Sequence, residues 1–136
     1  PDVTAQQAVQ HGIRACVGLI VIDFPTVWAE NSAAYIAKGL DIHDQLRHQP
    51  LITTSFAPHA PYTVSDDPLQ KIRTYADELE IPISMHVHET AHEVEQAQAN
   101  TGQRPLQRLH KLGLLTPSFI AVHMTLLTRD EISLFA

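Results

Sequence analysis

A length of 136 residues fits one domain with a single hydrophobic core. Hydrophobic residues make up 44% and charged residues 18%, a globular composition, and the net charge of -6 argues against a nucleic-acid partner, because binding phosphates needs a basic face. Nine histidines are the one unusual feature. The question is whether they gather into a metal site.

The single cysteine, Cys16, allows no internal disulfide and lies in the apolar run IRACVGLIVI, so we expect a buried core thiol in a reducing cytoplasm. No apolar run approaches the roughly 18 residues that span a bilayer, and the N-terminus does not resemble a signal peptide. We therefore expect a soluble, cytoplasmic protein without a membrane partner. The chain begins at Pro1, without methionine, and ends inside a helical pattern, so we expect an excerpt of a longer chain.

The first half of the chain predicts two strands separated by a helix. Residues 12–24 are rich in apolar and β-branched residues without strict alternation, which predicts a strand buried on both faces. Residues 25–48 carry apolar side chains at intervals of three to five and predict a helix. Residues 51–65 predict a second strand that ends in a rigid turn, because neither Pro58 nor Pro61 can donate to a ladder.

The second half repeats this alternation. Residues 66–80 predict a helix that Ser65 can cap, and residues 81–88 predict the third strand. Residues 90–112 predict a helix with a break around residues 102–105, and residues 118–124 predict the fourth strand. Two pairs have the spacing of a capping box, Thr90 with Glu93 and Thr128 with Glu131. Such alternation predicts a parallel sheet whose strands all end at one edge.

Histidines fall at or just past these strand ends, where α/β proteins bind their ligands: His59, His86, His88 and His123. Alternation along the third strand places His86 and His88 on the same side. Glu89 follows His86 by three residues, so its carboxylate could reach over a metal held by the imidazole. This spacing indicates a ligand followed by a base.

Each residue also has a plainer interpretation. A single strand-end histidine is more often a hydrogen-bonded loop or core residue, and Glu89 alone could be a first-turn charge at a helix N-terminus. Three strand ends that each carry a histidine are difficult to explain by chance. The remaining histidines are expected to be surface or structural residues: His11, His43, His48, His92 and His110.

Three motifs, FAPHAPYTVSDDPL, MHVHET and AVHMTLLT, in this order and spacing resemble the metal-dependent amidohydrolases. The most similar branch is that of the 5-methylthioadenosine/S-adenosylhomocysteine deaminases, whose relatives include the s-triazine hydrolases. The resemblance runs from Gly12 onward and implies a TIM-type (β/α)8 barrel with one divalent metal ion, usually zinc, at its C-terminal mouth. Residues 1–136 then look like part of one catalytic barrel, about its middle half, strands three to six.

The resemblance implies a role for each strand-end residue. His86 matches the metal ligand on the fifth strand, and Glu89 matches the proton shuttle that also contacts the substrate. His123 matches the sixth-strand histidine beside the attacking water, and His59 matches a residue that contacts a purine nucleoside. The only His-x-His pair, that of His86 and His88, has the setting of the fifth strand, so the family's first-strand pair is not in this chain. The eighth-strand aspartate is not in it either, because the chain ends just into the helix expected after His123. An arginine that some members carry on the early strand is absent around Leu19.

The implied activity is metal-dependent hydrolytic deamination of an adenine-type nucleoside: 5'-methylthioadenosine, S-adenosylhomocysteine or adenosine. Zinc would lower the pKa of its water to about 7, and Glu89 would relay that water's proton to the ring and to the departing ammonia. Alternatives are an s-triazine hydrolase, a guanine-type deaminase, or a non-catalytic fragment or binding module. The expected partner is a small-molecule substrate, and homo-oligomerisation is left open.

Overall fold

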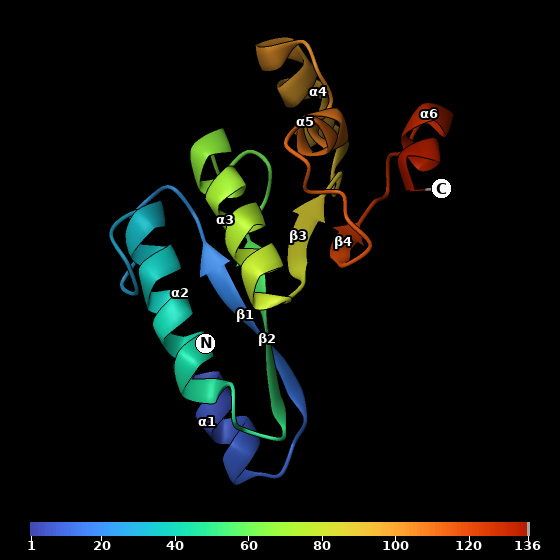
Figure 1. Ribbon diagram of the computed structural model, residues 1–136. Coiled ribbons are helices and arrows are strands. Elements are labelled where there is room, and N and C mark those ends of the chain that lie inside the picture. Colours follow the sequence, from blue (N-terminus) through green and yellow to red (C-terminus); the bar gives the residue numbers. More distant parts are fainter. Residues whose placement is uncertain (136) are drawn as a thin grey trace.

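The computed structural model describes residues 1–135 and is built on a four-stranded parallel sheet in the order β1-β2-β3-β4 (Figure 1). The strands are β1 (Ala15–Val21), β2 (Ile52–Pro58), β3 (Ile83–Val87) and β4 (Phe119–His123). Each strand pairs in parallel with the next one along the chain. The predicted alternation of strands and helices is confirmed, and all strand C-termini meet at one edge.

The helices are α1 (Asp2–Gln10), α2 (Ser32–Leu46), α3 (Asp66–Leu79), α4 (Ala91–Thr101), α5 (Pro105–Lys111) and α6 (Arg129–Ile132), followed by a 3-10 turn (Ser133–Phe135). The sequence patterns did not predict α1. The predicted break after α4 is confirmed, because Gly102 ends that helix with a φ of 71°. The helix expected from residue 25 begins only at Ser32, where the Asn31 side chain accepts the Ala34 N–H at 3.0 Å. Within residues 1–135 no helix is long and apolar enough to cross a bilayer.

The hydrophobic core lies between the sheet and α2 and α3, which cover one of its faces (Figure 1). Leu19, Phe56 and Met85 are at most 2% exposed on this face. Burying side chains of this size contributes about 1.5–3 kcal/mol each. Burial alternates along β1, so the expectation of a strand buried on both faces is wrong. Cys16 is exposed and not a core thiol, because among the described residues no element covers the opposite, open face.

Two hydrogen-bonding contacts that the sequence did not indicate connect different elements. His43, expected at the surface, is half-buried, and its Nδ1 lies 2.7 Å from the Thr54 hydroxyl, which connects α2 to β2. Ser65 occupies the N-cap of α3, but its side chain makes no capping hydrogen bond. Its N–H instead donates to Asp23 Oδ2 at 2.8 Å, so the end of β1 is connected to the start of α3.

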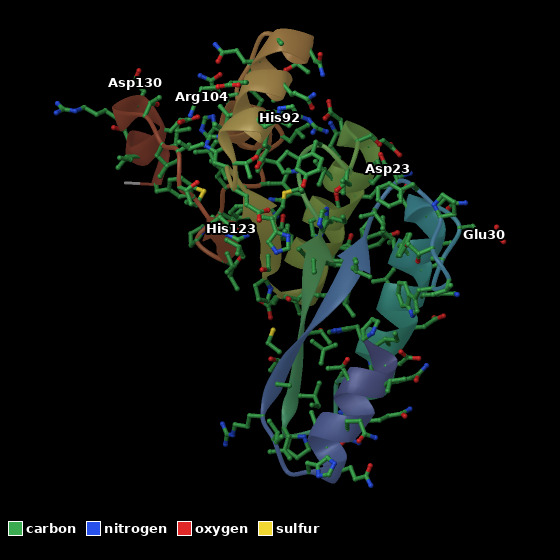
Figure 2. All side chains as sticks on the ribbon, turned by 180° about the vertical axis from the view of Figure 1, so that it is seen from behind. Asp23, Glu30, His92, Arg104, His123 and Asp130 are labelled. Atoms are coloured by element: carbon green, nitrogen blue, oxygen red, sulfur yellow. The ribbon has the colours of Figure 1, made fainter. Side chains whose placement is uncertain are left out.

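A buried ion pair holds the C-terminal helix. Arg104, the N-cap residue of α5, is labelled in Figure 2. It donates from Nε and Nη2 to the Glu131 carboxylate of α6 at 2.7 and 3.0 Å. The capping box of Thr128 and Glu131 is confirmed. Glu131 is 2% exposed. Burial raises the pKa of Glu131, but the hydrogen bonds from Arg104 and from the Thr128 N–H lower it further, so the net shift is downward.

Glu131→Gln should therefore destabilise the protein in a pH-dependent way. A carboxyl whose pKa is lower in the folded state stabilises that state above its unfolded pKa of about 4.3, and this contribution is lost as the pH falls through the folded value. The gap in melting temperature between wild type and Glu131→Gln should be wide at pH 7 and shrink below about pH 4.5. A gap of the same size at both pH values would contradict the role of the carboxylate charge.

The sheet also predicts the behaviour of residues 1–136 expressed alone. β1 and β4 are edge strands, and the open face carries apolar side chains such as Ile20 and Val122. Unpaired strand edges and uncovered apolar surface favour association between chains. Sedimentation should show self-association or aggregation, calorimetry weak zinc binding at most, and a coupled assay no ammonia release. A monomer with tight zinc and measurable turnover would overturn this expectation.

Candidate functional site

Four side chains predicted from the sequence converge at the carboxyl edge of the sheet. The ring of His86 lies 5.4 Å from that of His59 and 5.3 Å from that of His123, measured between centroids. Glu89 Oε2 is 3.6 Å from His123 Nε2. His123 stands at the end of β4, beside the ends of the neighbouring strands (Figure 2). The structure therefore brings together His59, His86, Glu89 and His123, although their roles remain predictions.

His86 is oriented by the backbone of the neighbouring strand. Its N–H donates to the carbonyl oxygen of His59 at 3.1 Å, and its ring Nδ1 lies 3.0 Å from the same oxygen. A carbonyl only accepts, so Nδ1 is assigned the proton. Nε2 then keeps its lone pair. This is the state in which a histidine binds a metal, with the other nitrogen held by a backbone carbonyl.

His88 does not share the side of His86, and that expectation is wrong. The backbone at His88 has a φ of 53°, so the chain turns as it leaves β3 and the alternation ends at Val87. The imidazole is 0% exposed, with Nδ1 at 3.1 Å from the Leu126 carbonyl and Nε2 accepting the Leu106 N–H at 3.3 Å. Burial lowers the pKa of His88, and nearby Glu131 opposes that shift. With both nitrogens bonded, His88 is a structural residue.

The backbone at the end of β4 is also unusual. His123 and Met124 have φ values of 74° and 54°, and neither is a glycine. Each such residue costs on the order of 1–3 kcal/mol, and strain of this kind clusters at functional sites. The Met124 N–H donates to the Val87 carbonyl at 3.0 Å, which fixes the turn against β3. The turn holds His123 beside Glu89.

His59 sits in the loop between β2 and α3. Its Nδ1 lies 3.0 Å from the Thr63 hydroxyl, and its N–H donates to the Val21 carbonyl at 3.1 Å. Burial, followed by the proximity of His86, lowers the pKa of His59. The imidazole is therefore neutral at neutral pH. Tyr62 contacts its ring edge-on, with the centroids 6.1 Å apart.

Arg108 of α5 forms hydrogen bonds with this loop. No sequence motif indicated this contact. Its Nε donates to Asp66 Oδ1 at 2.6 Å and its Nη2 to the Val64 carbonyl at 2.9 Å. Nη1 donates to the Pro61 carbonyl. One guanidinium thus satisfies three acceptors on the segment that follows His59, which fixes the loop relative to α5.

Two hollows adjoin the cluster on different sides. One of about 270 Å³ lies on the open face of the sheet and is lined by His59, His86, Ala57 and Val122, among others. The other, of about 530 Å³, lies between α4, α5 and the β2–α3 loop and includes Glu89 and Tyr62 in its lining. The larger hollow includes none of the three clustered histidines. His59 and His86 line the smaller hollow and Glu89 lines the larger one, so the cluster stands between the two.

Part of a metal donor set is present. Over residues 1–135, no group of three or more His, Cys, Asp or Glu side chains is arranged to hold a metal ion. His86 still fits as one donor, because its Nδ1 is bound to a carbonyl, which leaves the lone pair of Nε2 for a metal. A closed zinc site requires four ligands, so further donors would have to join it.

Comparison with known proteins agrees with this geometry. The chain is 48% identical over 134 residues to a 5-methylthioadenosine/S-adenosylhomocysteine deaminase of Saccharophagus degradans, covering 98% of this chain but 30% of that protein. A crystal structure of an adenosine deaminase from Xanthomonas campestris with bound zinc superimposes with a TM-score of 0.95 at 53% identity, covering 98% of this chain and 30% of that one. The chain thus spans under a third of these relatives.

A more distant structure supports the fold alone. Guanine deaminase from C. acetobutylicum, with guanine bound in its active site, matches with a TM-score of 0.85 at 17% identity over 96% of this chain. The predicted fold class is confirmed, since the parallel α/β sheet matches part of a TIM-type barrel; its assignment to strands three to six stays a prediction. The model of the amidohydrolase family matches residues 2–136, and the chain belongs to that family.

Proposed function

We propose that this segment forms part of a metal-dependent hydrolytic deaminase acting on an adenine-type nucleoside. The observation that carries the proposal is the convergence of His59, His86, Glu89 and His123 at the ends of neighbouring parallel strands. Two relatives support the substrate class. The 48% identical protein is a 5-methylthioadenosine/S-adenosylhomocysteine deaminase, and the 53% identical one is an adenosine deaminase.

His86 is the residue of this segment that would hold the metal, through Nε2. A bound divalent ion, zinc in the proposal, supplies a water whose pKa is lowered to about 7, so that it is a nucleophile at neutral pH. The carbonyl of His59 keeps the His86 ring in one orientation. Zinc is supported by its presence in the adenosine deaminase structure.

Glu89 and His123 act on the proton and on the attacking water. Their side chains are 3.6 Å apart, so a water between the strand ends can contact both. Glu89 takes one proton from that water and gives it to the ring nitrogen. It then takes the second proton from the hydroxyl now bound to the carbon and gives it to the amine, which leaves as ammonia. His123 orients the water toward the carbon that bears the amine. The adenine-type ring gains the water oxygen and loses ammonia, becoming an inosine-type ring.

His59 contacts the purine. Its imidazole is neutral, because burial and His86 hold its pKa down, and it lines the 270 Å³ hollow on the open face. Its Nδ1 contacts the Thr63 hydroxyl, so Nε2 is the ring nitrogen left to hydrogen-bond a heteroaromatic substrate. We assign His59 to substrate binding and Glu89 to both binding and proton transfer.

Ammonia release distinguishes this function from its relatives in the superfamily. The full-length protein should release ammonia from 5'-methylthioadenosine, S-adenosylhomocysteine or adenosine. It should leave chlorotriazines and guanine unchanged. Chloride release from a chlorotriazine, with no ammonia from any adenine nucleoside, would exclude the proposed substrate class.

Glu89→Gln in the full-length protein should keep its metal and lose at least about a hundredfold in kcat, because a proton shuttle and not a ligand is removed. Metal content by mass spectrometry and ammonia release by a coupled assay measure the two effects. Turnover close to that of the wild type would rule out the assigned role.

His86→Ala should lose metal and activity together, since a ligand is removed from the site. His110→Ala is the matched control, because His110 is exposed on α5. Zinc titration of both variants should show weakened binding in the first and no change in the second. Full metal occupancy in His86→Ala would mean that this imidazole is not a ligand.

A further inference from the structure

Glu93, in the first turn of α4, makes two hydrogen bonds outside its own helix. Its Oε1 accepts the N–H of His88 at 3.1 Å, and its Oε2 accepts the N–H of Glu89 at 2.9 Å. The carboxylate is buried, with 8% of the residue exposed. Both oxygens are therefore used on the segment that carries the proposed proton shuttle.

This arrangement departs from the capping box that the spacing of Thr90 and Glu93 predicts. Half of the box is present, because the Thr90 hydroxyl accepts the Glu93 N–H at 3.2 Å. In the other half, the glutamate should accept the N–H of Thr90. It accepts the two N–H groups that precede Thr90 instead. The Glu93 carboxylate thus fixes the backbone of the turn that leads from β3 into α4.

The turn needs such support, because the side chain of Glu89 has little of its own. Glu89 has 49% of its side chain exposed, and its carboxylate lies 3.6 Å from His123 Nε2. The residue before it, His88, has the left-handed φ of 53°. Where Glu89 points therefore depends on how firmly the backbone of this turn is fixed.

Thr125 fixes the same turn from the side of β4. Its N–H donates to the His88 carbonyl at 3.1 Å. Its hydroxyl lies 2.8 Å from the His88 carbonyl and 3.0 Å from the Glu89 carbonyl. Glu93 therefore holds the N–H groups of the turn while Thr125 holds its carbonyls, and His123 lies two residues before Thr125.

We propose that Glu93 is a positioning residue that fixes the backbone of Glu89 so that its carboxylate reaches the water and the substrate. The inference rests on the proposed function, in which Glu89 moves the proton. Fixing a group in place lowers the entropy that must be lost in the transition state. Glu93 touches neither substrate nor metal in this role, and acts only through the His88–Glu89 backbone.

Glu93→Gln is the sharpest variant, because the amide keeps the size and one acceptor but turns its NH2 group toward a backbone N–H. Two donors then face each other, and one of the two bonds is lost. Partners that orient active groups typically contribute about 10–100-fold to activity. In the full-length protein we expect kcat to fall by about that factor with KM nearly unchanged. Glu95→Gln, exposed two residues further along α4, is the matched control and should not change kcat.

A double variant separates positioning from general damage to the fold. If Glu93 acts only through Glu89, Glu89→Gln combined with Glu93→Gln should lose no more activity than Glu89→Gln alone. A residue that merely stabilises the protein would add its own loss. Losses that multiply in the double variant, or a Glu93→Gln enzyme with wild-type kcat, would overturn the inference.

Amide hydrogen exchange gives a readout that does not depend on activity. In Glu93→Gln, whichever amide of His88 and Glu89 loses its acceptor should exchange at least about tenfold faster, while amides in the interior of β2 stay protected. Thr125→Val, which removes only the hydroxyl, should loosen the same peptide to a smaller degree. Unchanged exchange at both amides would contradict the positioning role. If wild type releases no ammonia from any nucleoside, the proposed function fails and this exchange result alone decides the inference.

Discussion

The left-handed turn at His88 is the constraint on which the rest of the site depends. By alternation His88 would join His86 on the open face of the sheet, but a φ of 53° sends it into the layer between sheet and helices. Of the pair, only His86 is left on the open face, and His88 hydrogen-bonds to the backbone of two later segments. One backbone angle therefore divides a His-x-His pair into a candidate ligand and a structural residue.

Burying the His88 imidazole is energetically unfavourable, and polar neighbours compensate for it. An imidazole and a carboxylate, His88 and Glu131, lie 3.8 Å apart with almost no exposure. Arg104 makes two hydrogen bonds to the carboxylate, and its Nη2 also donates to the Leu126 carbonyl, which His88 contacts too. A buried charge left without a partner costs several kcal/mol, so the members of this group depend on one another. Their mutual dependence connects α5 and α6 to the turn that bears Glu89.

The sequence predicts the strands because they are apolar runs bounded by turn residues. It also predicts that His59, His86 and His123 gather, because parallel strands end at one edge. The side on which His88 lies could not be predicted, since its left-handed φ leaves no periodic signal in the sequence. The residues that hydrogen-bond to its backbone, Glu93 and Thr125, are not distinguished by any pattern either. The exposure of Cys16 depends on which face of the sheet is covered, which β1 alone does not show.

Contacts between residues that are far apart in the sequence could not be predicted either. Arg108 bonds to the loop after His59 from about forty positions away, and nothing in α5 distinguishes it from an ordinary helical arginine. Each proposed site residue is in fact fixed from a neighbouring element: His86 by the carbonyl of His59, Glu89 by α4, and His123 by the turn against β3. Of these supports only that of Glu89 comes from a helix, α4, whereas His86 lines the open face of the sheet. A metal held by His86 would therefore lie on the open face of the sheet.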